Sequence, residues 1–138
     1  MDAALTAALG RSQLIDLTTT GRRTGAPRRI EIYLHNLGGR LVISGMPREE
    51  TRAWIRNVEA TPAVTIHLKQ GLRADLAATA RVITDPDERH DLLVGVARNW
   101  RRTDLDVMQR YSPLIEVTVP GYPGEAASEA ATAGTSAA

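Results

Sequence analysis

The sequence predicts a mainly β domain of the α+β class, a small antiparallel barrel with peripheral helices. Three observations support this class. Apolar and polar residues alternate with a period of two in several segments, glycine-containing turns join these segments into hairpins, and two stretches with helical spacing lie between them. An open α+β sheet with helices on one face accommodates the same order less well. A chain of 138 residues is long enough for one domain, which we place at residues 1–120.

The first half of this domain contains one short helix and three strands. An Ala- and Leu-rich stretch over residues 2–11 predicts the helix, and a strand follows that ends near Thr20. Glycines and a proline over residues 21–27 are typical of a turn. Alternation over residues 30–35 predicts the second strand, and Gly38-Gly39 predicts a hairpin to the third at 41–43.

The second half is expected to begin with a helix over Arg48 to Ala60, ended by Thr61-Pro62. Two strands at residues 64–68 and 74–83 should pair as a hairpin. Asp85 is a suitable N-cap for a second helix, and the last strand should span residues 114–119. Residues 121–138 contain mostly small side chains and are expected to be a disordered C-terminal tail.

Composition excludes several classes of protein. The sequence has no cysteine, which excludes disulfides and cysteine-ligated zinc. Its apolar runs are too short for a membrane-spanning helix and its N-terminus does not resemble a secretion signal, so we expect a cytoplasmic protein. The net charge is only +1, yet every basic residue except Lys69 is arginine, and arginine binds phosphate and carboxylate through a planar fork. Anionic ligands are therefore indicated.

No catalytic side chain stands out in the sequence. The three histidines lack the spacing of metal ligands, and we expect them to be solvated or hydrogen-bonded at the surface. Ser44 lies outside any Gly-x-Ser-x-Gly motif. The acidic pairs Glu49-Glu50 and Asp87-Glu88 are expected in first helical turns, where carboxylates suit the helix dipole. The sequence predicts neither a metal site nor a nucleophile.

The segment 19–29 is the strongest candidate for ligand binding. It contains Arg22, Arg23, Arg28 and Arg29, threonine hydroxyls and two glycines, and it contains no acidic residue. Guanidinium forks, hydroxyls and accessible backbone amides together can hold a phosphate. A solvated basic hairpin tip explains the same composition equally well.

Two motifs resemble the deazaflavin-dependent nitroreductase family. The segment Thr19-Thr20-Gly21-Arg22-Arg23-Thr24-Gly25-Ala26-Pro27-Arg28 is similar to that family's signature loop. The segment 54–64 is similar to its Trp-x-x-Asn helix and the turn and strand that follow. The likeness extends over residues 13–119. It implies a split β-barrel related to flavin-binding barrels and an oxidoreductase that uses reduced coenzyme F420, a deazaflavin.

The resemblance also implies roles for particular residues. The loop would hold the phosphate and the anionic glutamyl tail of F420. The ring would lie against the second strand near Glu31 and Ile32 and face the strand end at residues 44–46. No side chain need act as a catalytic acid or base, although Tyr33 or solvent could supply a proton. The implied cofactor-binding residues are Thr20, Gly21, Arg22, Arg23, Thr24, Gly25, Arg28, Ile32, Ser44, Gly45, Met46, Trp54 and Asn57.

The sequence leaves the substrate, the bound ligand and the oligomeric state open. Residues 46–48 and 98–102 depart from the family pattern, so the electron-poor small-molecule substrate could be a quinone, a nitro compound or an enone. FMN, haem or a fatty acid could occupy the same cleft. A nucleic-acid binder that uses the arginines is disfavoured, because two Trp, three Tyr and no Phe offer few stacking surfaces. A homodimer is compatible with the barrel.

Overall fold

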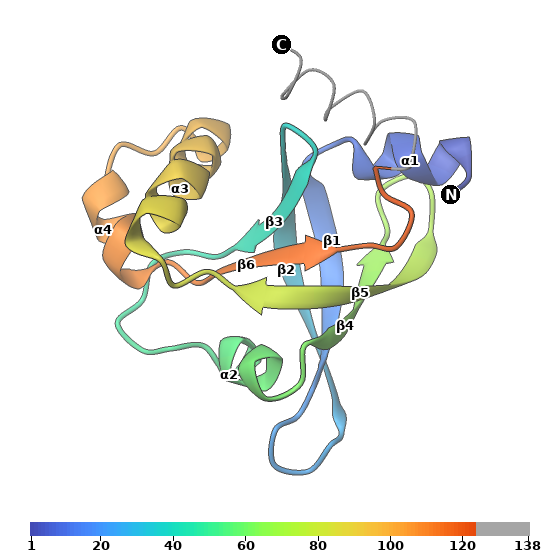
Figure 1. Ribbon diagram of the computed structural model, residues 1–138, viewed down its shortest axis with the longest axis horizontal. Helices are drawn as coiled ribbons and strands as arrows, with labels where there is room; N and C mark the ends of the chain where they lie inside the picture. The colour runs from blue at the N-terminus through green and yellow to red at the C-terminus, as the bar shows by residue number, and fades with distance from the viewer. Residues whose placement is uncertain (124–138) are drawn as a thin grey trace.

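Six antiparallel strands close into a barrel in the computed structural model, which describes residues 1–123 (Figure 1). The strand order around the barrel is β1-β2-β3-β6-β5-β4. The antiparallel barrel predicted from the sequence is therefore confirmed, and the open sheet is not found. The strands are β1 (Gln13–Thr20), β2 (Pro27–Leu37), β3 (Arg40–Ser44), β4 (Ala63–Leu68), β5 (Ala74–Val82) and β6 (Leu114–Thr118).

Alternation along β1 determines which side chains enter the barrel. Ile15 and Leu17 are fully buried and point inward, whereas Asp16 and Thr18 lie on the outer side. β1 pairs with β2 over its whole length and with β4 over Ile15 to Thr18. The predicted hairpin at Gly38-Gly39 is present, and both glycines have positive φ angles of 63° and 94° that favour this residue type.

The predicted C-terminal tail lies almost entirely outside the described residues, which end at 123. Its first residues are described, and Tyr122 packs against the barrel core. The Tyr122 hydroxyl accepts a hydrogen bond of 2.8 Å from the side-chain amide of Asn36. The part of the chain that packs on the barrel therefore extends to Tyr122.

Four helices within residues 1–123 surround the barrel: α1 (Ala3–Leu9), α2 (Ala53–Ala60), α3 (Pro86–Trp100) and α4 (Leu105–Tyr111). α3 and α4 pack together on one side of the barrel (Figure 1). α2 lies near the barrel end from which the β1–β2 loop extends, whereas α1 lies toward the other end (Figure 1). As predicted, Asp85 caps α3, because its carboxylate accepts a 2.9 Å bond from the Glu88 amide.

Two apolar clusters hold this arrangement together. The first fills the barrel and includes Leu34, Ile43 and Ile66. The second lies between the outer side of the sheet and the α3–α4 pair, and includes Val42, Leu93 and Met108. Each fully buried aliphatic side chain contributes about 1.5–3 kcal/mol to folding. The second cluster therefore fixes α3 and α4 against the barrel.

The predicted start of the second helix and the predicted surface position of His35 were wrong, and one helix was missed. α2 begins at Ala53 and not at Arg48, so the acidic pair at residues 49–50 lies in a loop and not in a first helical turn. The seven-residue helix α4 was not expected. His35 is completely buried because α3 covers the outer face of β2, on which its side chain lies.

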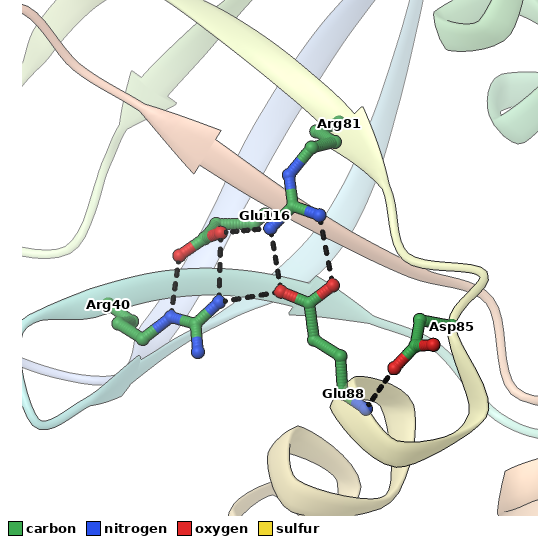
Figure 2. A network of polar contacts seen from close by, with 5 residues as sticks. All are labelled: Arg40, Arg81, Asp85, Glu88 and Glu116. Atoms are coloured by element: carbon green, nitrogen blue, oxygen red, sulfur yellow. Dashed lines mark hydrogen bonds and ion pairs between the residues drawn. The ribbon is translucent and has the colours of Figure 1, made fainter.

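An ion-pair network connects three strands to α3 (Figure 2). Arg40 of β3 binds Glu116 of β6 at 2.7 Å and Glu88 of α3 at 3.1 Å. Arg81 of β5 binds the same two carboxylates at 2.8 Å each. Hydrogen bonds from Arg81, then from Arg40, lower the pKa of Glu88 to about 2. Both carboxylates are shared, so the network couples the docking of α3 to the pairing of β6.

Within residues 1–123, no helix is both long and apolar enough to cross a membrane. The same residues bring together no group of three or more histidine and acidic side chains that could hold a metal ion.

Candidate functional site

A cavity of about 630 Å3 lies between the β1–β2 loop and α2, and we call it the arginine hollow. The loop extends from the barrel beside α2 (Figure 1). Strand β1 and the start of β2 carry the loop on one side, and the first turns of α2 form the other side. The lining residues are Gly21, Arg22, Arg23, Thr24, Pro27, Arg28, Arg29, Ile30, Ala53, Trp54 and Asn57.

The backbone of the loop is closed by hydrogen bonds between its ends. The Gly21 amide donates to the Ala26 carbonyl at 2.7 Å, and the Gly25 amide donates to the Gly21 carbonyl at 2.8 Å. Gly25 has a φ of 75°, a conformation that glycine adopts without strain. A Cβ atom at Gly21 would stand only 2.9 Å from the Ala26 carbonyl oxygen. Glycine at this position therefore allows the loop to fold tightly.

Asn57 of α2 fixes the position of the loop. Its side-chain oxygen accepts bonds from the Arg22 amide at 3.1 Å and from the Arg22 guanidinium at 3.4 Å. Its side-chain nitrogen donates to the Thr19 hydroxyl at 3.1 Å. Asn57 is only 3% exposed, so these polar atoms depend on one another for hydrogen bonds.

The hollow carries positive charge that its surroundings do not neutralise. Arg29 is paired with Asp16 at 3.0 Å. Arg22, Arg23 and Arg28 are exposed, and the described residues place no carboxylate within ion-pair distance of them. Asp16 is shared with Lys69, whose hydrogen bond makes the largest contribution to lowering the pKa of Asp16. Three guanidinium groups therefore remain available to an anionic ligand.

The beginning of α2 adds to this field. Ala53, the first helical residue, lines the hollow, and Arg52 at the N-cap makes no side-chain capping bond. The backbone amides at a helix start carry partial positive charge and favour anions. Trp54 and Ile30 supply apolar surface in the same cavity. The arginine hollow is thus suited to a ligand that has both phosphate and apolar parts.

Seven of the residues implied by the resemblance line this hollow: Gly21, Arg22, Arg23, Thr24, Arg28, Trp54 and Asn57. Four lining residues were not among them: Pro27, Arg29, Ile30 and Ala53. Pro27 and Arg29 are the sequence neighbours of Arg28, and Ala53 is the neighbour of Trp54. These three lining residues could therefore have been predicted from their position next to implied residues. Thr20, Gly25, Ile32, Ser44, Gly45 and Met46 are outside the lining.

Most of the residues implied for the cofactor ring lie together at the end of β3. The Ile32 side chain lies 3.5 Å from the position of a Cβ on Gly45, so these two residues are adjacent. The Ser44 hydroxyl is buried and donates to the Pro113 carbonyl at 2.7 Å. Met46 is 56% exposed, and the guanidinium of Arg102 lies 3.2 Å from its sulfur.

The outer side of the barrel carries two histidine arrangements that sequence reasoning did not describe. His67 lies between Thr18 and Asp75, each at 2.7 Å from one of its ring nitrogens. The His35 ring packs at an angle against Tyr33 and edge-to-face against Trp100, with ring-centroid distances of 4.8 Å, and burial lowers the pKa of His35 to about 4. Tyr33 is half-buried in this aromatic cluster. Neither histidine lines the arginine hollow.

A family model described as F420H(2)-dependent quinone reductase matches residues 2–120 of the chain. Three solved structures share the fold. A conserved hypothetical protein, Rv2991, from Mycobacterium tuberculosis is 17% identical with a TM-score of 0.70, and the match covers 87% of this chain and 81% of that one. A structure described as an F420 reductase is 19% identical with a TM-score of 0.58, and the match covers 82% of this chain and 90% of that one.

The third structure is described as a domain-swapped dimer. It is 19% identical with a TM-score of 0.59, and the match covers 76% of this chain and 79% of that one. At these identities the three structures establish the barrel fold, and the family model carries the information about chemistry.

Proposed function

Because the chain belongs to the F420H(2)-dependent quinone reductase family, we propose that the arginine hollow holds the phosphate and the glutamyl tail of reduced F420. The family makes this chain an oxidoreductase that uses reduced F420 to transfer a hydride to quinone-type substrates. The observation that carries the proposal is that Arg22, Arg23 and Arg28 line one cavity and have no carboxylate partner among residues 1–123.

The donors in the hollow fit an anionic cofactor. Charge-assisted hydrogen bonds from arginine to phosphate are short, strong and frequently bidentate. Arg22 is already held by Asn57, so little freedom is lost when it binds. Arg23 and Arg28 are exposed and are free to follow the tail. The Thr24 hydroxyl, which accepts a bond from the Ala26 amide at 3.2 Å, keeps its proton for donation to the ligand.

The cofactor ring is expected beside Ile32, Gly45 and Met46, at the end of β3. When bound, F420 supplies the hydride. The residues of the chain hold the tail, orient the ring and limit access of water to it. Trp54 lines the hollow, so a ligand bound there alters the surroundings of its indole.

The proposal is tested by titrating the protein with F420 and following tryptophan quenching. The double variant Arg22→Gln/Arg23→Gln should bind at least tenfold more weakly, because each charged hydrogen bond contributes about 1.5–3 kcal/mol. The matched control is Arg73→Gln/Arg98→Gln, which removes the same charge from two exposed positions outside the hollow.

Equal F420 affinity in the two double variants would contradict the assignment of the arginine hollow. A parallel titration with FMN distinguishes the alternative flavin ligand. Tighter binding of FMN than of F420 would be consistent with the fold and with a ligand in the arginine hollow, but it would overturn F420 as that ligand. Raising the salt concentration should weaken F420 binding in the unmodified protein more than in the Arg22→Gln/Arg23→Gln variant.

For assembly, we propose a homodimer. The support is the likeness in fold to a structure described as a domain-swapped dimer. Light scattering after size-exclusion chromatography should give twice the chain mass of 15.0 kDa. A mass of one chain over a broad range of protein concentrations would contradict it.

A further inference from the structure

A second pocket, separate from the arginine hollow, lies between the loop before α2 and the ends of β5 and β6. We call it the Arg52 pocket; its volume is about 310 Å3, and residues 48–52, Ile55, 82–84, Arg89 and 110–114 line it. It shares no lining residue with the arginine hollow. Different residues of α2 line the two cavities: Ala53 and Trp54 line the hollow, whereas Ile55 lines the Arg52 pocket.

Arg52 brings an uncompensated guanidinium to this pocket. One terminal nitrogen, Nη2, donates to the Met46 carbonyl at 2.6 Å. The other, Nη1, is buried and has no hydrogen-bond partner in the structure. Burial lowers the pKa of Arg52, and the positive charge of Arg48 lowers it further. A buried donor without an acceptor is unfavourable because its lost hydration is not replaced, and the more so when it is charged.

A second buried donor lines the same pocket. Ser112 is 3% exposed, and its hydroxyl oxygen has no hydrogen-bond partner in the structure. Arg89, which also lines the pocket, bonds only to carbonyl oxygens, among them those of Ile83 at 3.1 Å and Ser112 at 2.9 Å. Its positive charge is therefore solvated by dipoles and is not neutralised by a carboxylate.

The remaining charges of the pocket leave it positive. Arg48 and Arg110 are exposed at its edge, as are Glu49 and Glu50. Arg48 and Glu50 approach each other to 4.0 Å. Four arginines therefore line the pocket with two glutamates, and the two partly buried arginines, Arg52 and Arg89, have no acidic partner among the described ion pairs.

We propose that the Arg52 pocket binds a small organic carboxylate with an apolar body. The carboxylate accepts hydrogen bonds from Arg52 Nη1 and from the Ser112 hydroxyl, the two buried side-chain donors of the lining residues that lack partners among residues 1–123. Ile55, Val82 and Leu114 give the apolar part of the ligand a wall to pack against. This inference does not depend on the arginine hollow, with which the pocket shares no lining residue.

Benzoate is the probe for this site, and benzamide is its uncharged analogue of nearly the same shape. Both are titrated into the full chain without F420, and amide chemical shifts are followed by NMR. We expect saturable shifts at residues 51–55 and at Ser112 with benzoate, and at least tenfold weaker binding of benzamide, because a charged hydrogen bond contributes about 1.5–3 kcal/mol.

Variants identify the donors. Arg52→Gln should weaken benzoate binding at least tenfold, and Ser112→Ala should weaken it about threefold, as expected for one neutral hydrogen bond. Arg73→Gln, which removes an exposed charge elsewhere, should bind benzoate as the unmodified protein does. Ser112→Ala removes a single oxygen, so it keeps the test valid if Arg52→Gln folds poorly.

Four results would overturn the inference: absence of benzoate binding, equal binding of benzamide, shifts confined to residues 22–24, or unchanged affinity in both variants. The Arg22→Gln/Arg23→Gln variant separates this inference from the cofactor proposal. It should lose F420 affinity and keep benzoate affinity. Loss of benzoate affinity in that variant would place the carboxylate in the arginine hollow and would contradict the Arg52 pocket.

Discussion

The side-chain oxygen of Asn57 holds Arg22 twice, through the backbone amide at 3.1 Å and through the guanidinium at 3.4 Å. A helix residue thereby positions a loop residue that is distant in sequence. The arginine hollow exists in its present shape because this contact joins its two walls.

Replacing Asn57 with alanine should therefore affect stability and binding together. The Arg22 amide loses its acceptor and the Thr19 hydroxyl loses a donor, so the free energy of unfolding should fall by about 1–3 kcal/mol. F420 affinity should also fall, because Arg22 is no longer held. Urea denaturation and the F420 titration measure the two effects.

Asn57→Asp separates the two effects. Aspartate keeps an acceptor for Arg22 but adds a negative charge beside it, so F420 should bind more weakly than it does to Asn57→Ala. Equal or tighter F420 binding in the aspartate variant would show that the charge of Arg22 does not act on the cofactor.

Gly21→Ala tests the tightness of the loop. The added methyl group would meet the Ala26 carbonyl oxygen at 2.9 Å, and that oxygen is part of the backbone. The loop must shift, at a cost of about 1–3 kcal/mol as for other overpacked sites. F420 affinity should fall while the barrel remains folded, as circular dichroism would show. Unchanged affinity would mean that the position of Arg22 tolerates a shifted loop.

The ion-pair network predicts loss of stability in acid. Arg81 and Arg40 hold the pKa of Glu88 at about 2, below its ordinary value of 4.5, and the pKa of Glu116 is lowered as well. The unfolded chain therefore binds protons first, so this contribution is complete above pH 4.5 and disappears as the pH falls toward about 2. Denaturant titrations over this range should show a smaller pH slope in Glu88→Gln than in the unmodified protein.

The burial of His35 predicts that stability also declines over a second, higher pH range. Burial lowers its pKa from 6.5 to about 4, and its Nδ1 accepts a 3.0 Å bond from the amide of Asn99. The unfolded state takes up the proton first, so the stability from the neutral buried ring is complete above pH 6.5 and declines as the pH falls toward about 4. His35→Gln should remove the slope that His35 contributes in this pH range and leave the slope below about pH 4 unchanged.

The fold was largely predictable because its strands alternate clearly. Ile15 and Leu17 point into the barrel and Asp16 points out, as a period of two requires. The start of α2 was not predictable from local composition. Arg48 donates its amide to the Tyr111 carbonyl, and Arg52 binds the Met46 carbonyl; the first contact lies far away in sequence. The burial of His35 depends likewise on packing against α3.

The loop of the arginine hollow could be found from sequence because its four arginines lie within residues 22–29 and no acidic residue lies among them. The Arg52 pocket could not be found, since its residues come from three stretches that are far apart in the sequence, within 48–55, 82–89 and 110–114. Asn57 was expected in the pocket wall, and its bonds to Arg22 and Thr19 required the three-dimensional arrangement.

The place of β6 has a consequence for the growing polypeptide. Among the strands within residues 1–123 it is the last to be synthesised, and it pairs with β3 on one side and β5 on the other. Until residues 114–118 leave the ribosome, both neighbours present unpaired edges that can join other chains. The barrel closes only after β6 has been synthesised, so a chain that stops before residue 114 exposes two aggregation-prone edges.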